Sequence, residues 1–174
     1  MANFKLDIKG LDKIQSKYNK LPKELKEEIT EEIVAWGREV NAAQLSLISQ
    51  QKIQDLGALQ QNTKANPIKD GVELISNVYY APFVEFGTGS QVKVPAELNE
   101  YAAQFRGKSR GGFRDFVKAL QAWIKRKGGN PKMAYIAAIN ILNRGLKARP
   151  YFFPPYFQKK DNLIKNIQNV IKKL

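Results

Sequence analysis

The sequence predicts an α+β fold, in which a long N-terminal helix and several C-terminal helices pack on a small, mainly antiparallel sheet. Three observations lead to this prediction. The 174 residues match the size of one domain. Apolar residues recur at steps of three and four over residues 22–50 and over later stretches, whereas residues 63–78 combine turn signals with a short strand pattern. We therefore expect a single domain over residues 1–174, with a basic and mainly helical stretch at about residues 91–130.

The first elements expected along the chain are a short strand and a helical stretch. The strand is indicated by apolar residues that alternate with polar or charged ones: Phe4, Leu6 and Ile8. This strand ends at Gly10. Leu11, Ile14 and Tyr18 then follow at helical spacing before Leu21-Pro22.

A long helix is expected over residues 22–50. Pro22 can occupy its first position, because the N–H that proline lacks would have no helical partner there. Glutamates follow in the first turns, where the helix dipole favours acids. The apolar side chains form one stripe: Leu25, Ile29, Ile33, Trp36, Val40, Ala43 and Leu47. Their near-heptad spacing predicts a partner helix, either from the same chain, which we favour, or from a second copy.

Turns, a hairpin and an aromatic segment are expected between residues 51 and 89. Asp55-Leu56-Gly57 is predicted to be a turn. A hairpin is predicted over residues 63–78, with Asn66-Pro67 and Lys69-Asp70-Gly71 as turn signals. Residues 79–86 hold four aromatic side chains, and Gly87-Thr88-Gly89 must then turn the chain.

The rest of the chain is predicted to be mainly helical. Residues 95–105 fit a helix, and residues 106–112 fit a basic loop. Apolar residues return at helical spacing from Phe113 and stop at Gly128-Gly129, and Asn130-Pro131 opens another helix that runs to Gly145. Residues 149–157 carry five aromatics and three prolines, for which we expect an extended chain, and a last amphipathic helix follows to Leu174.

The missing residue types exclude most catalytic chemistry. The chain has no His and no Cys, so it cannot build an imidazole base, a thiol nucleophile or a zinc site of the usual ligands. The acids of the irregular middle do not converge by spacing: Glu85, Glu97, Glu100 and Asp115. For Glu85, between Val84 and Phe86, we expect a structural role, such as bonding the amides of Gly87 and Thr88 or a basic partner. We expect no enzymatic activity and no cofactor.

Charge is unevenly distributed along the chain, whose formal net charge is +13. Residues 1–90 hold 11 basic and 12 acidic side chains, whereas residues 91–174 hold 18 basic and 4 acidic ones. This basic half fits DNA, an acidic protein face or an anionic membrane, or it is a solvated surface. Candidate contacts to DNA or to an acidic partner are Arg106, Lys108, Arg110, Lys125, Arg126 and Lys127.

Targeting signals are not evident in the sequence. No apolar run approaches the roughly 20 residues that a spanning helix needs. Lys5, Asp7 and Lys9 stand where a signal peptide needs its apolar segment. We therefore expect a protein made and used in a cytoplasm, with no membrane partner.

One segment, residues 79–89, reads YYAPFVEFGTG. It closely resembles the signature of the tail-completion or head-tail joining proteins, a family of neck proteins of tailed double-stranded DNA bacteriophages. Three further segments agree with that family in order: Gly10-Leu11-Asp12, Asp55-Leu56-Gly57-Ala58-Leu59, and Arg149-Pro150-Tyr151-Phe152-Phe153-Pro154. The chain departs from the family pattern in three places: it lacks a Thr in the turn at residues 55–57, it has Pro155 in place of a small residue, and residues 91–130 are longer.

The resemblance implies a small subunit without catalytic activity, assembled as a ring around the DNA channel between the capsid portal or connector and the tail. It implies as partners copies of the chain, other neck, portal or tail proteins, and packaged DNA. It also implies a location in the virion, after assembly in the host cytoplasm. The residues that carry the motif and are candidates for interface contacts are Asp55, Gly57, Tyr79, Tyr80, Phe83, Glu85, Phe86, Gly87, Thr88, Gly89, Arg149, Pro150, Tyr151 and Phe152.

Two other functions stay open from the residues alone. The first is a basic nucleic-acid-binding module of a phage or mobile element, because Lys and Arg could neutralise phosphates while aromatics stack on bases. The second is a small enzyme that works only with carboxylates and Lys.

Overall fold

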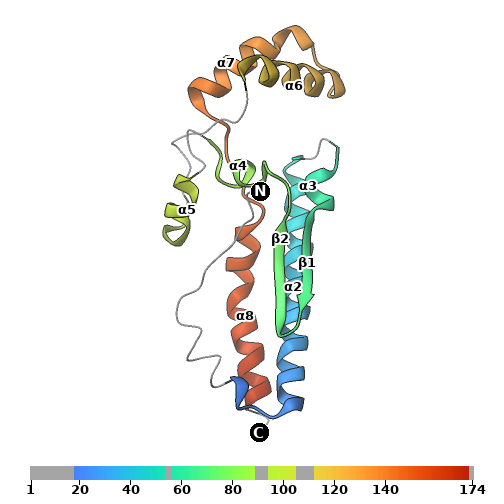
Figure 1. Cartoon of the computed structure of the whole chain (residues 1–174), viewed down its shortest axis with the longest axis vertical. Coiled ribbons are helices and arrows are strands. Elements are labelled where there is room, and N and C mark those ends of the chain that lie inside the picture. The colour runs from blue at the N-terminus through green and yellow to red at the C-terminus, as the bar shows by residue number, and fades with distance from the viewer. Residues whose placement is uncertain (1–17, 54–55, 89–93, 105–111, 173–174) are drawn as a thin grey trace. The chain divides into compact units, whose positions relative to one another are not determined.

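The computed structural model describes residues 18–53, 56–88, 94–104 and 112–172 (Figure 1). The expected strand at residues 4–8 lies outside this part of the chain, as do most of the helical stretch at residues 11–18 and the expected basic loop at residues 106–112 except Gly112. The fold is mainly helical α+β, as predicted, with a long N-terminal helix, a two-stranded hairpin and several C-terminal helices. The chain forms two compact units: unit 1 comprises residues 1–79 and 151–174, and unit 2 comprises residues 80–150.

The long helix of unit 1 is α2, Lys23–Gln50. Its 28 residues correspond to about 42 Å at 1.5 Å per residue. Pro22 stands just before the first helical residue, one position earlier than predicted. The partner helix comes from the same chain, because α8 (Phe153–Ile171) packs alongside α2 (Figure 1). Leu25, Ile29 and Val170 form a buried cluster between these two helices.

The buried face of α2 differs from the predicted stripe in the second half of the helix. Gln44 and Ile48 are fully buried there, whereas Ala43 and Leu47 are half-buried. The reason is that the hairpin also packs on this part of α2. Gly37 faces Val72 of the hairpin, and the Asn41 side chain donates a hydrogen bond to the Thr63 carbonyl (3.1 Å).

The predicted hairpin is confirmed. Strands β1 (Thr63–Ile68) and β2 (Gly71–Ser76) pair antiparallel, and Lys69 and Asp70 connect them. Asn66 and Pro67 lie within β1, so their prediction as a turn was wrong. A proline is tolerated there because both strands of a two-stranded sheet are edge strands. The short helix α3 (Ala58–Gln61) precedes the hairpin.

Unit 2 contains only helices among its described residues. In chain order they are α4 (Ala81–Phe86), the 3-10 turn η1 (Ala96–Leu98), α5 (Asn99–Ala103), α6 (Phe113–Arg126), the 3-10 turn η2 (Pro131–Met133) and α7 (Ala134–Arg144). The predicted helix at residues 95–105 is broken into η1 and α5. The predicted stops after α6 and α7 are confirmed, because Gly128 and Gly145 have positive φ. The predicted start at Asn130-Pro131 opens η2 instead of α7: the Asn130 side chain accepts the Lys132 amide (3.0 Å), and α7 begins at Ala134.

The proline-aromatic segment lies outside helices and strands only as far as Phe152, which itself has helical φ and ψ. Pro154 and Pro155 lie in the first turn of α8, so the prediction of an extended chain over this part was wrong. Proline is tolerated at this position because the first N–H groups of a helix have no intrahelical partner. None of the helices in the described part of the chain is long and apolar enough to cross a membrane.

Candidate functional site

The motif residues of unit 2 lie on and just after the short helix α4. Tyr80 precedes the helix, and Pro82 stands in its first turn, where proline fits. Glu85 and Phe86 are buried, and Phe86 packs edge-on against Tyr101 with ring centroids 5.7 Å apart. The second half of the motif helix is therefore part of the interior of unit 2.

Gly87 ends α4 in a backbone conformation that glycine alone adopts readily. Its φ of 66° and ψ of 179° fall in a region that a side chain at this position would make strained. A Cβ atom here would lie 2.5 Å from the Leu146 carbonyl oxygen and 2.8 Å from the Ala148 nitrogen. Because both neighbours are backbone atoms, they cannot move aside without shifting the chain. Gly87 thus permits two distant segments to approach closely.

Three hydrogen bonds join these two segments. The Arg149 amide donates to the Val84 carbonyl (2.8 Å), and the Thr88 amide donates to the Leu146 carbonyl (3.1 Å). The Leu146 amide donates in turn to the Thr88 hydroxyl (2.7 Å). We refer to residues 84–88 and 146–149, joined in this way, as the motif clamp. The clamp brings together the aromatic-glycine segment and the start of the second segment that carries the family resemblance, Arg149.

Glu85 was expected to have a structural role, such as bonding the amides of Gly87 and Thr88 or a basic partner. It is buried, and the Thr88 amide donates to the Leu146 carbonyl. Leu146 and Ala148 are the functional residues that sequence reasoning missed. The only signal for them was Gly145, which also adopts a glycine-only conformation with φ 75° and ψ 168°, directly before the clamp.

The remaining C-terminal motif residues, Tyr151 and Phe152, belong to the core of unit 1. The Tyr151 hydroxyl is within 2.8 Å of the Ser76 hydroxyl, which is within 3.0 Å of the Thr63 hydroxyl. Thr63 donates to the Leu59 carbonyl (2.7 Å). Each hydroxyl has one proton, so the bond from Thr63 to Leu59 fixes the direction of the other two hydrogen bonds. Tyr151 donates to Ser76, and Ser76 donates to Thr63. Tyr151 is fully buried and ties the C-terminal segment to the hairpin.

A second buried polar contact holds the neighbouring residue. The Gln44 amide nitrogen donates to the Phe152 carbonyl at 2.9 Å, and Gln44 has no exposed surface. Sequence reasoning missed Gln44, although its position four residues after Val40 and four before Ile48 was a usable signal. Tyr151 and Phe152 are therefore packed inside the chain itself.

The motif aromatics differ in exposure. Phe86 is in the core, Tyr80 and Phe83 are half-buried, and Tyr79 is 68 % exposed. Gly57, a motif residue of unit 1, precedes α3 with φ 75°. Asp55 and Gly89 lie outside the described residues.

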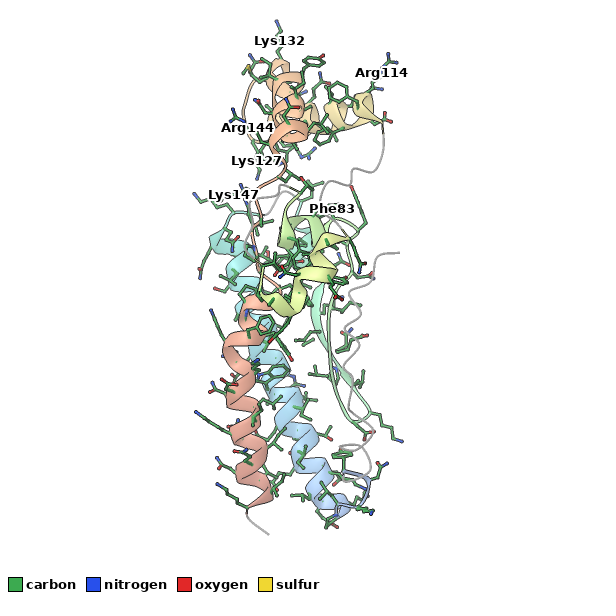
Figure 2. All side chains as sticks on the ribbon, turned by 90° about the vertical axis from the view of Figure 1, so that its left-hand side faces the viewer. Phe83, Arg114, Lys127, Lys132, Arg144 and Lys147 are labelled. Atoms are coloured by element: carbon green, nitrogen blue, oxygen red, sulfur yellow. The ribbon has the colours of Figure 1, made fainter. Side chains whose placement is uncertain are left out.

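The cationic candidates gather at one end of α6. Lys125, Arg126 and Lys127 are exposed at the C-terminal end of this helix, where the dipole favours positive charge. Arg106, Lys108 and Arg110 lie outside the described residues. Residues 112–150 hold nine Lys or Arg and a single acid, Asp115. Figure 2 shows four more of these cationic side chains on or beside α6 and α7: Arg114, Lys132, Arg144 and Lys147.

Across residues 18–53, 56–88, 94–104 and 112–172, no three acids come together in a cluster that could hold a metal ion. Glu97 and Glu100 are exposed on η1 and α5. No family model, curated protein or solved structure matches the chain, so its function has to be inferred from its own residues.

Proposed function

We propose that the chain is a structural, non-enzymatic subunit that joins the portal or connector of a phage capsid to the tail, as one member of a ring around the DNA channel. The motif clamp is the observation that supports this proposal most. Two of the four segments that carry the resemblance to neck proteins, residues 79–89 and 149–154, are far apart in the sequence, and they meet where the Arg149 amide donates to the Val84 carbonyl (2.8 Å). A chance resemblance in sequence would not be expected to bring parts of the family signature together in space.

The roles of the motif residues favour a structural function. Gly87 permits a close backbone approach, and Thr88 bonds both the carbonyl and the amide N–H of Leu146. Phe86 and Tyr151 fill the interiors of their units. Each of these roles fixes the shape of the chain, and none of them needs a reacting group. In a ring, each subunit presents one surface to a different surface of the next copy, so a fixed shape is what assembly requires.

The direct test is an electron-microscopy map of the neck in particles of the phage that encodes the chain. We expect density for a ring of this fold between the portal and the tail. Mass photometry of the chain mixed with its portal should show ring-sized particles, whereas the chain alone can stay monomeric until a partner templates it. Failure to find the chain in purified particles would contradict the proposal.

A charge-reversal variant tests the role of the basic end of α6. We expect Lys125→Glu, Arg126→Glu and Lys127→Glu together to impair virion assembly and to leave helix content unchanged, because all three residues are exposed. The matched control is a triple charge reversal in unit 1, Lys64→Glu, Lys69→Glu and Lys172→Glu, at exposed positions. Normal infectivity of the triple variant would contradict a role for these charges.

A second candidate, a nucleic-acid-binding module, is favoured by the charge of residues 112–150. Nine cations against one acid would give binding to double-stranded DNA that weakens steeply with salt. A gel shift of the purified chain over a salt series tests it. Tight, salt-dependent binding by the monomer, together with absence from the particle, would favour this candidate.

A further inference from the structure

The α6–α7 pair of unit 2 exposes large apolar side chains on its outer surface. No residue of α6 is fully buried, and in α7 only Ala134 and Ala138 are. Helix α7 begins after Met133 and carries Tyr135, Ile136, Ile139 and Leu142, which are between 38 and 57 % exposed. Contiguous exposed apolar side chains of this kind mark interaction surfaces.

One side chain of this set contacts α6: the Tyr135 ring packs edge-on against Phe113, with ring centroids 5.6 Å apart, and is still 57 % exposed. The half-buried apolar side chains of the helix pair are others, such as Leu120, Ile124 and Ile141. Tyr135, Ile139 and Leu142 follow each other at i, i+4 and i+7, so they form a second stripe along about two turns of α7. A stripe of this spacing is the pattern that a further helix packs against.

The charges around the stripe limit what can cover it. Lys127, Lys132, Arg144 and Lys147 lie on or beside the same helix pair (Figure 2), and Asp115 is the single acid of residues 112–150. The same face of a second copy would bring like charges together, which costs affinity. The acids of α2 offer no match either, because Glu24, Glu27 and Glu31 form a charged face rather than an apolar one.

Other anionic partners fit the stripe less well. DNA would engage the cations and leave Ile139 and Leu142 without an apolar partner. A membrane-bound amphipathic helix carries many Lys or Arg on its own polar face, whereas α7 itself carries one, Arg144, beside Asn140 and Asn143. A partner with both apolar anchors and carboxylates matches both features of the surface.

We propose that the α7 stripe binds an acidic amphipathic helix of another protein, with apolar anchors against Tyr135, Ile139 and Leu142 and carboxylates toward the surrounding cations. This assigns a partner chemistry to one surface and holds whether or not the chain is a neck subunit. Trp123 is exposed on α6 of the same helix pair, so its fluorescence is the signal chosen to follow binding. The other tryptophan, Trp36, is buried and donates to the Lys159 carbonyl (2.9 Å).

The test uses the full chain and three synthetic helical peptides of about 20 residues. The first has a leucine stripe flanked by Glu, the second has the same stripe flanked by Lys, and the third has Glu but no stripe. We expect only the first to shift Trp123 fluorescence to the blue, and Trp123→Phe to abolish the signal. Equal binding of the first two, or of the first and third, would overturn the proposal.

Two variants localise the binding. Leu142→Glu, at a position 54 % exposed, should weaken the first peptide at least about tenfold with unchanged circular dichroism. Ile68→Glu, at a matched 55 % exposure in unit 1, should leave the affinity within about twofold. If Leu142→Glu loses helix content, Leu142→Ala replaces it, with an expected weakening of about threefold. Unchanged affinity in the folded Leu142 variant would overturn the proposal.

Two further probes distinguish the competing partners. A Trp123 shift with vesicles of anionic lipid, and none with the first peptide, would assign the stripe to a membrane instead. A shift that grows with protein concentration alone, accompanied by dimers in sedimentation, would assign it to a second copy. We expect neither, and either result would overturn the proposal.

Discussion

The core of unit 1 and the α6–α7 pair of unit 2 differ in how far they bury large apolar side chains. Between α2, α8 and the hairpin of unit 1, Val40, Ile48 and Tyr151 have no exposed surface. The α6–α7 pair of unit 2 leaves side chains such as Ile136 and Leu142 mostly exposed. Unit 2 also carries the charge imbalance, with 13 Lys or Arg against 4 acids, compared with 16 against 12 in unit 1. The fully buried core of unit 1 and the exposed apolar and cationic side chains of α6 and α7 therefore lie in different parts of the chain.

The units also differ in the kind of hydrogen bonds that join distant segments within each of them. Unit 1 uses buried side-chain hydrogen bonds from Tyr151 and Gln44, whereas unit 2 uses the backbone hydrogen bonds of the motif clamp. Each unit holds one of the two tryptophans, Trp36 in unit 1 and Trp123 in unit 2. Single-tryptophan variants can therefore report the unfolding of each unit separately, and the predictions below use them.

The largest effect is expected from Gly87→Ala, which breaks the clamp of unit 2. A Cβ atom at this position adds backbone strain and overlaps the Leu146 carbonyl and the Ala148 nitrogen. We expect the free energy of unfolding reported by Trp123 to fall by about 3 kcal/mol or more. The value reported by Trp36 should change little, which would show that the units are stabilised independently.

Gly128→Ala is the matched control for this prediction. Gly128 also has a positive φ, 75°, at which an alanine would be strained. A Cβ atom there would have no neighbour within 4 Å. We expect a loss of about 1 kcal/mol from strain alone. A Gly87→Ala cost no larger than that of Gly128→Ala would show that the close approach in the clamp contributes nothing.

The next effect concerns the buried hydroxyl chain of unit 1. Tyr151→Phe removes the proton that Ser76 accepts and leaves a buried oxygen without its donor. We expect the free energy of unfolding reported by Trp36 to fall by about 1 to 2 kcal/mol. Tyr135→Phe, at an exposed phenol of unit 2, should change this free energy of unfolding by less than about 0.5 kcal/mol. Equal effects of the two substitutions would mean that the buried hydroxyl chain does not stabilise unit 1.

Local signals in the sequence predicted much of the fold. The predicted helix at residues 22–50 is observed as Lys23–Gln50, and the helices ending near Gly128 and Gly145 have the predicted stops. Periodicity and capping depend on residues a few positions apart, so a single sequence contains them in full. The exposed cations of α6 were likewise predictable from composition and spacing.

The pairings between distant segments could not be predicted. The clamp joins Thr88 to Leu146, and the core of unit 1 joins Gln44 to Phe152, more than one hundred residues apart. Burial of a polar residue such as Gln44 is favourable only when its partner is present, and the partner depends on tertiary structure. Pro67 illustrates the same limit of sequence reasoning. Asn66-Pro67 is a turn signal locally, but pairing with β2 places both residues within β1.

A smaller effect is expected where α2 meets the hairpin. A Cβ atom on Gly37 would lie 2.6 Å from both Val72 methyl groups, which costs about 2 kcal/mol of overpacking. Alanine regains about 1 kcal/mol of helix propensity, so Gly37→Ala should destabilise unit 1 by about 1 kcal/mol. In the double variant with Val72→Ala the overpacking should vanish, and a double-mutant cycle measures this coupling. Additive effects would show that the two elements do not touch as described.

The smallest effect is a dependence of the stability of unit 2 on alkaline pH that unit 1 does not share. Burial raises the pKa of Tyr101 in unit 2 above its ordinary value of 10.0. The folded state therefore holds this proton more tightly than the unfolded state. The stability that it contributes is fully present below pH 10 and is lost as the pH rises through the raised pKa. Urea unfolding above pH 10, followed by Trp123, should show a decline that Tyr101→Phe makes shallower, while the Trp36 signal of unit 1 is unaffected by this substitution. An identical alkaline decline in Tyr101→Phe would mean that another group of unit 2 causes it.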